Sequence, residues 1–122
     1  MGKAGRPFLV KTMHLPGFLA LDSQQKLLSE IKEALKTSPF YIPTLRTGKT
    51  MNLQMTNFGH WGWMADTYTY SKIHPGTGKP WAGIPSFGIT IIDALIYHNQ
   101  LPKDFLPEGC ICNLYKPGNR LG

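Results

Sequence analysis

The sequence predicts an α+β fold in which two helices support a small amount of antiparallel β-structure. Apolar residues recur at helical spacing from Asp22 to Lys36 and from Ser86 to Asn99, and both runs are too long for strands. Apolar and polar residues alternate from Met51 to Thr56, and Cys110 to Tyr115 also has the character of a strand. A chain of 122 residues with 42% hydrophobic content suits one domain with a modest core.

The first 49 residues are predicted to form a scaffold of one strand and one helix. The apolar run Phe8–Val10 predicts the strand, and Asp22 with Gln25 matches a capping box at the start of the helix. The charged residues of this helix, Glu30 among them, are expected on a solvated face, and Pro39 ends the pattern. Its apolar stripe, expected as one buried face, comprises Leu27, Leu28, Ile31 and Leu35.

The stretch from Thr50 to Trp81 holds all three tryptophans and a single carboxylate. The strand that starts at Met51 is expected to break at Asn57–Gly59 and to form a hairpin with Tyr68–Ser71. An aromatic hairpin with glycine hinges, flanked by Lys49, Lys72 and Lys79, suits a platform on which flat bases stack. The alternative is that these aromatic residues fill the core of a small domain.

The C-terminal region is predicted to contain a helix with Ser86 as N-cap and, after a proline-punctuated loop, the strand from Cys110 to Tyr115. Alternation places Cys110 and Cys112 on one face of that strand, with Ile111 and Asn113 on the other. Because no second pair of Cys or His lies at ligand spacing, we interpret the cysteines as small core residues and not as zinc ligands.

Charge and composition exclude several classes of protein. The net charge of +6 favours a polyanionic partner such as nucleic acid, or an anionic membrane surface. No apolar run approaches the length of a membrane span or a signal-peptide core, so a cytoplasmic location is the default expectation. Gly48-Lys49-Thr50 matches the end of a phosphate-binding loop, but Pro43 stands where that motif needs glycine, which argues against a nucleoside triphosphatase.

Six short motifs follow one another along the chain: Thr50-Met51, Met55-Thr56-Asn57, Gly59-His60-x-Gly62-Trp63, Tyr68-x-Tyr70-Ser71, Gly78-Lys79-Pro80-Trp81 and Asn113-Leu114-Tyr115-Lys116-Pro117-Gly118. Their residues and their order resemble those of AlkB-type dioxygenases, which use iron and 2-oxoglutarate to remove alkyl groups oxidatively from nucleic-acid bases. The sequence resembles this family from about Ser38 onward. The resemblance implies a single partial domain, the N-terminal portion of a double-stranded β-helix (jelly-roll) dioxygenase. Residues 1–49 would be the scaffold, 50–81 a nucleotide-recognition lid, and 82–122 a support helix and the first core strand.

The resemblance also assigns residues to a substrate site and a cosubstrate site. In the lid it implies that Trp63 stacks on an extruded base, with Met51 and Met55 as its apolar neighbours. The implied contacts to the nucleic-acid backbone, or to the far side of the base, are Tyr68, Tyr70 and Arg120. On the last strand, the residues implied to hydrogen-bond 2-oxoglutarate are Asn113 and Tyr115. The remaining tryptophans, Trp61 and Trp81, are assigned to packing.

The resemblance implies Fe(II) and 2-oxoglutarate as cofactors of the complete enzyme. Two of the three iron ligands in this family lie in a His-x-Asp motif shortly after the Pro-Gly turn, and this chain stops at Gly122, before that position. None of the four histidines here is followed by aspartate two residues later.

We therefore expect an N-terminal, substrate-recognising part with no catalytic or metal-ligating residue of its own, inactive without a missing C-terminal half. Its expected partners are single-stranded or duplex alkylated DNA, or RNA. The alternative is a non-enzymatic single-strand binding or adaptor module.

Overall fold

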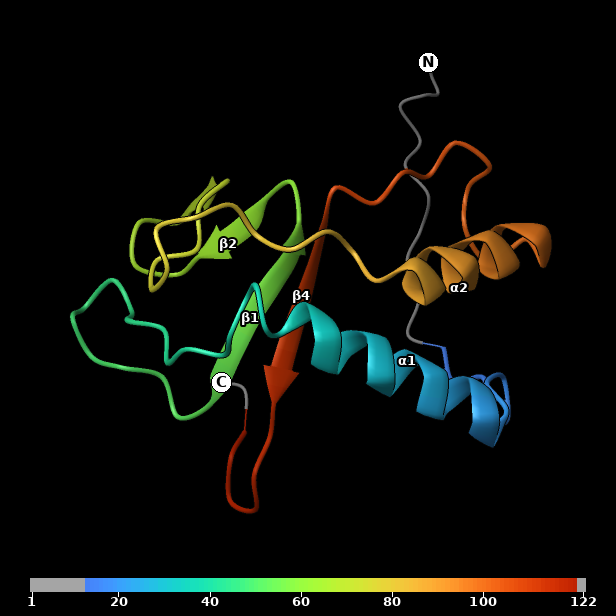
Figure 1. Cartoon of the computed structure of the whole chain (residues 1–122), viewed down its shortest axis with the longest axis horizontal. Coiled ribbons are helices and arrows are strands. Elements are labelled where there is room, and N and C mark those ends of the chain that lie inside the picture. Colours follow the sequence, from blue (N-terminus) through green and yellow to red (C-terminus); the bar gives the residue numbers. More distant parts are fainter. Residues whose placement is uncertain (1–12, 121–122) are drawn as a thin grey trace.

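A computed structural model describes residues 13–120 (Figure 1). Its elements, in chain order, are α1 (Leu21–Ala34), β1 (Gln54–Gly59), β2 (Gly62–Met64), β3 (Thr69–Ser71), α2 (Ser86–Tyr97) and β4 (Gly109–Leu114). Two helices with small antiparallel sheets confirm the predicted α+β arrangement, including both helices and the final strand. The strand predicted at Phe8–Val10 lies outside the described residues.

The β1–β4 pair lies between the two helices and the β2–β3 hairpin (Figure 1). The antiparallel register places Asn57 opposite Ile111 and Phe58 opposite Cys110. Residues directly opposite each other share a face of the sheet, so the first pair faces the hairpin and the second faces the helices. Because elements cover both of its faces, β1 carries four consecutive buried residues, Met55 to Phe58, where alternation would bury only every second one.

The predicted pairing of the central strand is wrong. The strand starts at Gln54, later than predicted, and continues through Asn57–Gly59 to pair with β4. The Tyr70 strand pairs with Gly62–Met64, so the hairpin is β2–β3. Asn57 does not break β1 because its buried side chain accepts a hydrogen bond from the backbone of β2. The chain turns only at Gly59, whose φ of 106° favours glycine.

The capping of both helices also differs from expectation. Helix α1 starts after Ala20, whose side chain cannot cap it, and the predicted capping box is absent. Asp22 lies inside the first turn, where its Oδ1 accepts the Ser23 N–H. The N-cap of α2 is Pro85, so Ser86 is the first helical residue. Glu30 of α1 caps α2 from outside: its carboxylate accepts the Phe87 backbone N–H at 2.7 Å and the Ser86 hydroxyl at 3.2 Å. Glu30 therefore joins the two helices and does not belong to a purely solvated face.

Substituting Glu30 by alanine should destabilise the chain by about 1–2 kcal/mol, because it leaves the Phe87 N–H and the Ser86 hydroxyl at the start of α2 without this partner. Thermal or urea unfolding would measure this. Glu33 is the matched control, since it forms an exposed i,i+3 ion pair with Lys36. Glu33→Ala should change stability by less than about 0.5 kcal/mol. Equal effects of the two substitutions would show that the contact of Glu30 with α2 contributes little.

The apolar stripe of α1 is less buried than predicted. Leu28 is exposed, and Leu27, Ile31 and Leu35 are only half-buried. Within the described chain, no residue of either helix is fully buried. The helices and β4 enclose a largely apolar cavity of about 230 Å³, with Phe58 and Ile91 among its lining residues. This side of the sheet is therefore incompletely filled.

The hairpin rests on a small core formed by Trp81 and His74. The indole N–H of Trp81 donates to the Ser71 carbonyl at 2.7 Å, and the indole ring lies 5.1 Å from the buried His74 ring. Nε2 of His74 is 2.7 Å from the carbonyl oxygen of Pro39, and its Nδ1 accepts the Gly76 N–H. These contacts confirm that Trp81 packs in the interior and that the segment around Gly76 is a turn.

Candidate nucleic-acid interface

One face of the β2–β3 hairpin is an exposed aromatic cluster. Trp63 lies opposite Tyr70 in the register, and their rings meet edge to face with centroids 5.2 Å apart. Tyr68 reaches the same indole at 5.4 Å from the turn that joins the strands. The two tyrosines are 62% and 64% exposed. Aromatic rings that touch one another yet remain in water offer a flat apolar surface to a ligand.

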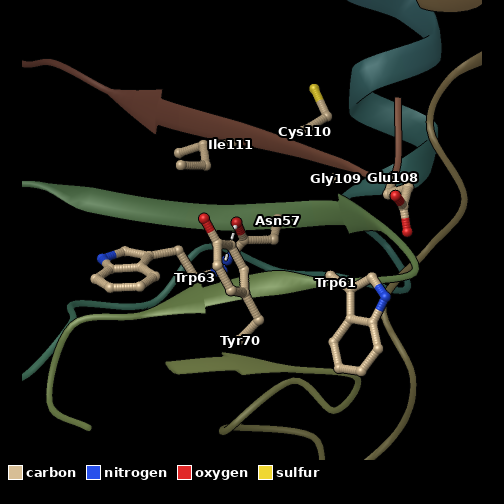
Figure 2. Close-up of a pocket in the computed structure, with 8 residues that line it drawn as sticks. All are labelled: Asn57, Trp61, Trp63, Tyr70, Glu108, Gly109, Cys110 and Ile111. Carbon is tan, nitrogen blue, oxygen red and sulfur yellow. Dashed lines mark hydrogen bonds between the residues drawn. The ribbon is translucent and has the colours of Figure 1, made fainter. Parts of the chain in front are cut away.

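The cluster opens on a cavity of about 560 Å³ between the hairpin and the β1–β4 pair (Figure 2). Its lining residues are Asn57, Trp61, Trp63, Tyr70, Glu108, Gly109, Cys110 and Ile111. Aromatic side chains from the hairpin form one side, and β1 and β4 form the other. The volume falls in the range of small-molecule sites, and the mostly apolar lining with a few polar groups is typical of them.

Asn57 provides a polar group at the base of this cavity. It is 0% exposed, and its Oδ1 accepts the Trp63 backbone N–H at 3.4 Å (Figure 2). Its Nδ2 has no hydrogen-bond partner among residues 13–120. An unpaired buried amide N–H costs free energy, so this position is held by the surrounding packing. Asn57 fixes the strand that carries Trp63 beside the cavity.

Two cationic side chains lie over the aromatic rings of the hairpin region. The guanidinium of Arg46 lies 5.2 Å from the centroid of Tyr68, and Nζ of Lys72 lies 4.9 Å from that of Trp61. Sequence reasoning identified Lys72 as a flanking lysine but missed Arg46, whose loop is closed by the bridge between Thr44 and Thr50. Cations beside exposed aromatic rings are typical of surfaces that bind single-stranded nucleic acid.

The structure gathers some of the predicted substrate residues and separates others. Trp63 and Tyr70 line the cavity, and Tyr68 contacts Trp63. Tyr68 itself does not line the cavity, and the other three predicted residues lie away from the cluster: Met51 is half-buried ahead of β1, Met55 is buried within β1, and Arg120 is exposed beyond β4.

Two lining residues escaped the sequence-based assignment. Trp61, assigned to packing, is 37% exposed, and Asn57 was interpreted as a strand break. In the sequence, Trp61 lies two residues before Trp63, and residues at that spacing in an extended segment point to the same face. This spacing was the signal that could have placed Trp61 beside Trp63.

The two residues predicted to contact 2-oxoglutarate lie together. Asn113 and Tyr115 project from the same face of the last strand, with the amide Nδ2 3.5 Å from the phenol oxygen. Both are at least partly accessible, and Ile111, two residues earlier on the same face, lines the cavity. An amide and a phenol fit a ligand that bears carboxylates, since both donate hydrogen bonds.

The described residues do not fit an iron site. Between residues 13 and 120, no group of three or more His, Cys, Asp or Glu side chains lies close enough to hold a metal. Cys110 and Cys112 are half-buried free thiols on the helix-facing side of β4, and burial raises the pKa of both, with Cys110 adding to the shift of Cys112. Their thiols therefore stay protonated at neutral pH, in keeping with a packing role.

Burial, and then the negative charge of Asp66, raises the pKa of the Tyr41 phenol. Tyr41 packs against the rings of both His74 and Trp81, which also contact each other. Its phenol is therefore a neutral hydrogen-bonding group over the physiological pH range.

In the described part of the chain, no helix is both long and apolar enough to cross a membrane.

Comparison with known proteins identifies the family. Residues 11–122 match the model of the 2OG-Fe(II) oxygenase superfamily. The chain belongs to this superfamily. Within it the chain is AlkB-like and corresponds to the N-terminal part.

The chain is 35% identical over 104 residues to the alpha-ketoglutarate-dependent dioxygenase AlkB of Escherichia coli (strain K12), a match covering 84% of this chain and 48% of that protein. It is 36% identical over 105 residues to AlkB of Salmonella typhimurium, with coverage of 84% and 48%. The AlkB homolog of Caulobacter vibrioides (strain NA1000 / CB15N) is 31% identical over 109 residues, with coverage of 88% and 47%. The chain thus spans about half the length of these relatives.

Proposed function

We propose that this chain is the substrate-recognising, N-terminal part of an oxidative nucleic-acid demethylase that repairs N-alkylated bases in single-stranded or duplex DNA, or in RNA. Its similarity to AlkB proteins supports the reaction class, and its net charge of +6 suits a polyanionic substrate. Fe(II) and 2-oxoglutarate supply the oxidising chemistry in the complete enzyme, where hydroxylation of the N-alkyl group leads to release of an aldehyde.

The observation that carries this proposal is the position of Trp63. Its indole packs edge to face with the rings of Tyr68 and Tyr70 and borders the cavity. A base taken out of its stack loses stacking energy, and a preformed aromatic surface returns part of it. Trp63 would receive the extruded base, and the tyrosines would limit its movement.

The cosubstrate would bind beside this base site. Asn113 and Tyr115 would donate hydrogen bonds to 2-oxoglutarate, and the oxidising chemistry would then take place at the strand face that continues from the cavity. The iron ligands would come from a C-terminal half, so we propose that the 122-residue chain is inactive alone. Residues 1–49, 50–81 and 82–122 would then serve as scaffold, lid and first wall of a double-stranded β-helix.

Replacing Trp63 by alanine tests the proposal. Stacking is worth about 1–3 kcal/mol per base, so Trp63→Ala should weaken binding of an N-methylated single-stranded oligonucleotide by roughly tenfold or more. Fluorescence anisotropy with a labelled oligonucleotide measures this directly. Tyr97 is the matched control, being an aromatic residue 81% exposed on α2, and Tyr97→Ala should leave affinity unchanged. Unchanged affinity in Trp63→Ala would remove this residue as the base platform.

A further inference from the structure

Trp61 has the features of a binding residue. It lines the cavity, is 37% exposed, and its ring lies at the opposite end of the cavity from Trp63, with Tyr70 between them (Figure 2). A large aromatic side chain exposed to water and facing a cavity forgoes burial that would stabilise the fold.

The backbone holds Trp61 firmly in this position. The carbonyl of Glu108 accepts the backbone N–H groups of His60 at 2.9 Å and Trp61 at 3.1 Å. A Cβ atom at Gly109 would lie 2.5 Å from the Trp61 carbonyl oxygen, so the strands approach as closely as they do only because that residue is glycine. The indole therefore projects from a fixed point of the lid.

Lys72 lies beside this indole. Extending the β2–β3 register by one pair beyond Gly62 and Ser71 places Lys72 opposite Trp61, and its Nζ lies 4.9 Å from the ring centroid. Lys72 is not among the residues that line the cavity, so the cavity side of the indole is free to meet a ligand. An ammonium group at the rim and a free aromatic surface inside match the two parts of a nucleotide, its phosphate and its base.

We propose that Trp61 and Lys72 form a second nucleotide subsite, which takes the base next to the extruded one. This inference rests on the proposed function, because it presumes an extruded base at Trp63. The neighbouring base would stack on Trp61, and Lys72 would contact a phosphate of the same strand. The ligand class is thus two or more consecutive unpaired nucleotides, and the subsite would favour single-stranded over duplex substrates because a paired neighbour cannot leave its stack.

The test compares a mononucleotide with an oligonucleotide. The probes are adenosine monophosphate methylated at N1 and a single-stranded pentanucleotide with that residue at its centre, both titrated against the full 122-residue chain. Trp61→Ala should weaken binding of the pentanucleotide by about tenfold and leave mononucleotide binding unchanged. Trp63→Ala should weaken both. Trp61→Tyr should restore most of the pentanucleotide affinity, which a mere loss of folding would not allow.

Lys72→Ala should reduce the slope of log affinity for the pentanucleotide against log salt concentration by about one, the contribution of one phosphate contact. Lys32→Ala, at an exposed lysine of α1, should not. The subsite is refuted if Trp61→Ala leaves pentanucleotide affinity intact while Trp63→Ala lowers it, and in that case the proposed function still stands. If neither tryptophan affects either probe, both the subsite and the proposed function fail. Equal loss for both probes in Trp61→Ala, without rescue by Trp61→Tyr, would show that Trp61 only supports the fold.

Discussion

Residues 1–122 combined with the C-terminal half of an AlkB-like oxygenase that carries the His-x-Asp motif are expected to convert 2-oxoglutarate to succinate, whereas residues 1–122 alone are not. The described residues contain no set of side chains able to hold iron, and the chain covers about half of its relatives. Production of succinate with Fe(II), 2-oxoglutarate and a methylated oligonucleotide is the measurement. This change from no turnover to turnover is the largest effect that we predict.

The structure gives a physical reason for the two halves to associate. Within residues 13–120, β4 pairs only with β1, so its outer edge offers unpaired N–H and C=O groups to another strand. The apolar cavity of about 230 Å³ beside α1 and α2 would be filled in the same step. Hydrogen exchange at β4 should therefore slow on association, while exchange in α1 should change little. The isolated chain should be loosely packed or self-associating.

The residues proposed to bind the cosubstrate, Asn113 and Tyr115, provide the control for this experiment. In the combined protein, Asn113→Ala should raise the KM for 2-oxoglutarate by roughly tenfold or more, because a hydrogen bond to a charged group is worth about 1.5–3 kcal/mol. If the combined protein binds oligonucleotides in a Trp63-dependent way yet produces no succinate, the non-enzymatic binding or adaptor module becomes the better description.

Gly62→Ala is expected to disrupt the β2–β3 hairpin and abolish oligonucleotide binding. A Cβ atom at this position would lie 2.4 Å from the ring carbons of Trp81, which is far inside van der Waals contact. Trp81 cannot move aside freely, because its indole N–H donates to Ser71 and its ring packs against His74. Overpacking of this kind typically costs about 1–3 kcal/mol of folding free energy. Here the clash would displace β2, the strand that carries Trp63.

Gly83→Ala is the matched control for this substitution. A Cβ atom there would meet no described atom within 4 Å, and the residue has no positive φ. Its stability and oligonucleotide affinity should therefore match those of the unchanged chain. Near-ultraviolet circular dichroism of the tryptophans, together with oligonucleotide anisotropy, distinguishes the two variants. A Gly62→Ala protein with an unchanged tryptophan signal would mean that the hairpin is not pressed against Trp81.

Local pattern in the sequence was sufficient for several elements. The helical spacing of apolar residues predicted α1 and α2 to within a few residues, because a one-sided apolar stripe at that period is stable only as a helix. Alternation predicted β4 and the shared face of Asn113 and Tyr115. Ordered short motifs, with Trp63 at their centre, indicated the family that the comparisons then identified.

Only the tertiary structure decided which segments meet. β1 pairs with β4 across a long separation in the sequence, and that partner allows Asn57 to lie inside a strand with its amide buried. Trp61 is exposed because the close approach of Gly109 fixes its backbone at the rim of the cavity, a contact that no local pattern records. Glu30 caps α2 only because two helices far apart in the chain pack together. Hydrogen bonds and packing between distant residues set these positions, and local propensity does not contain them.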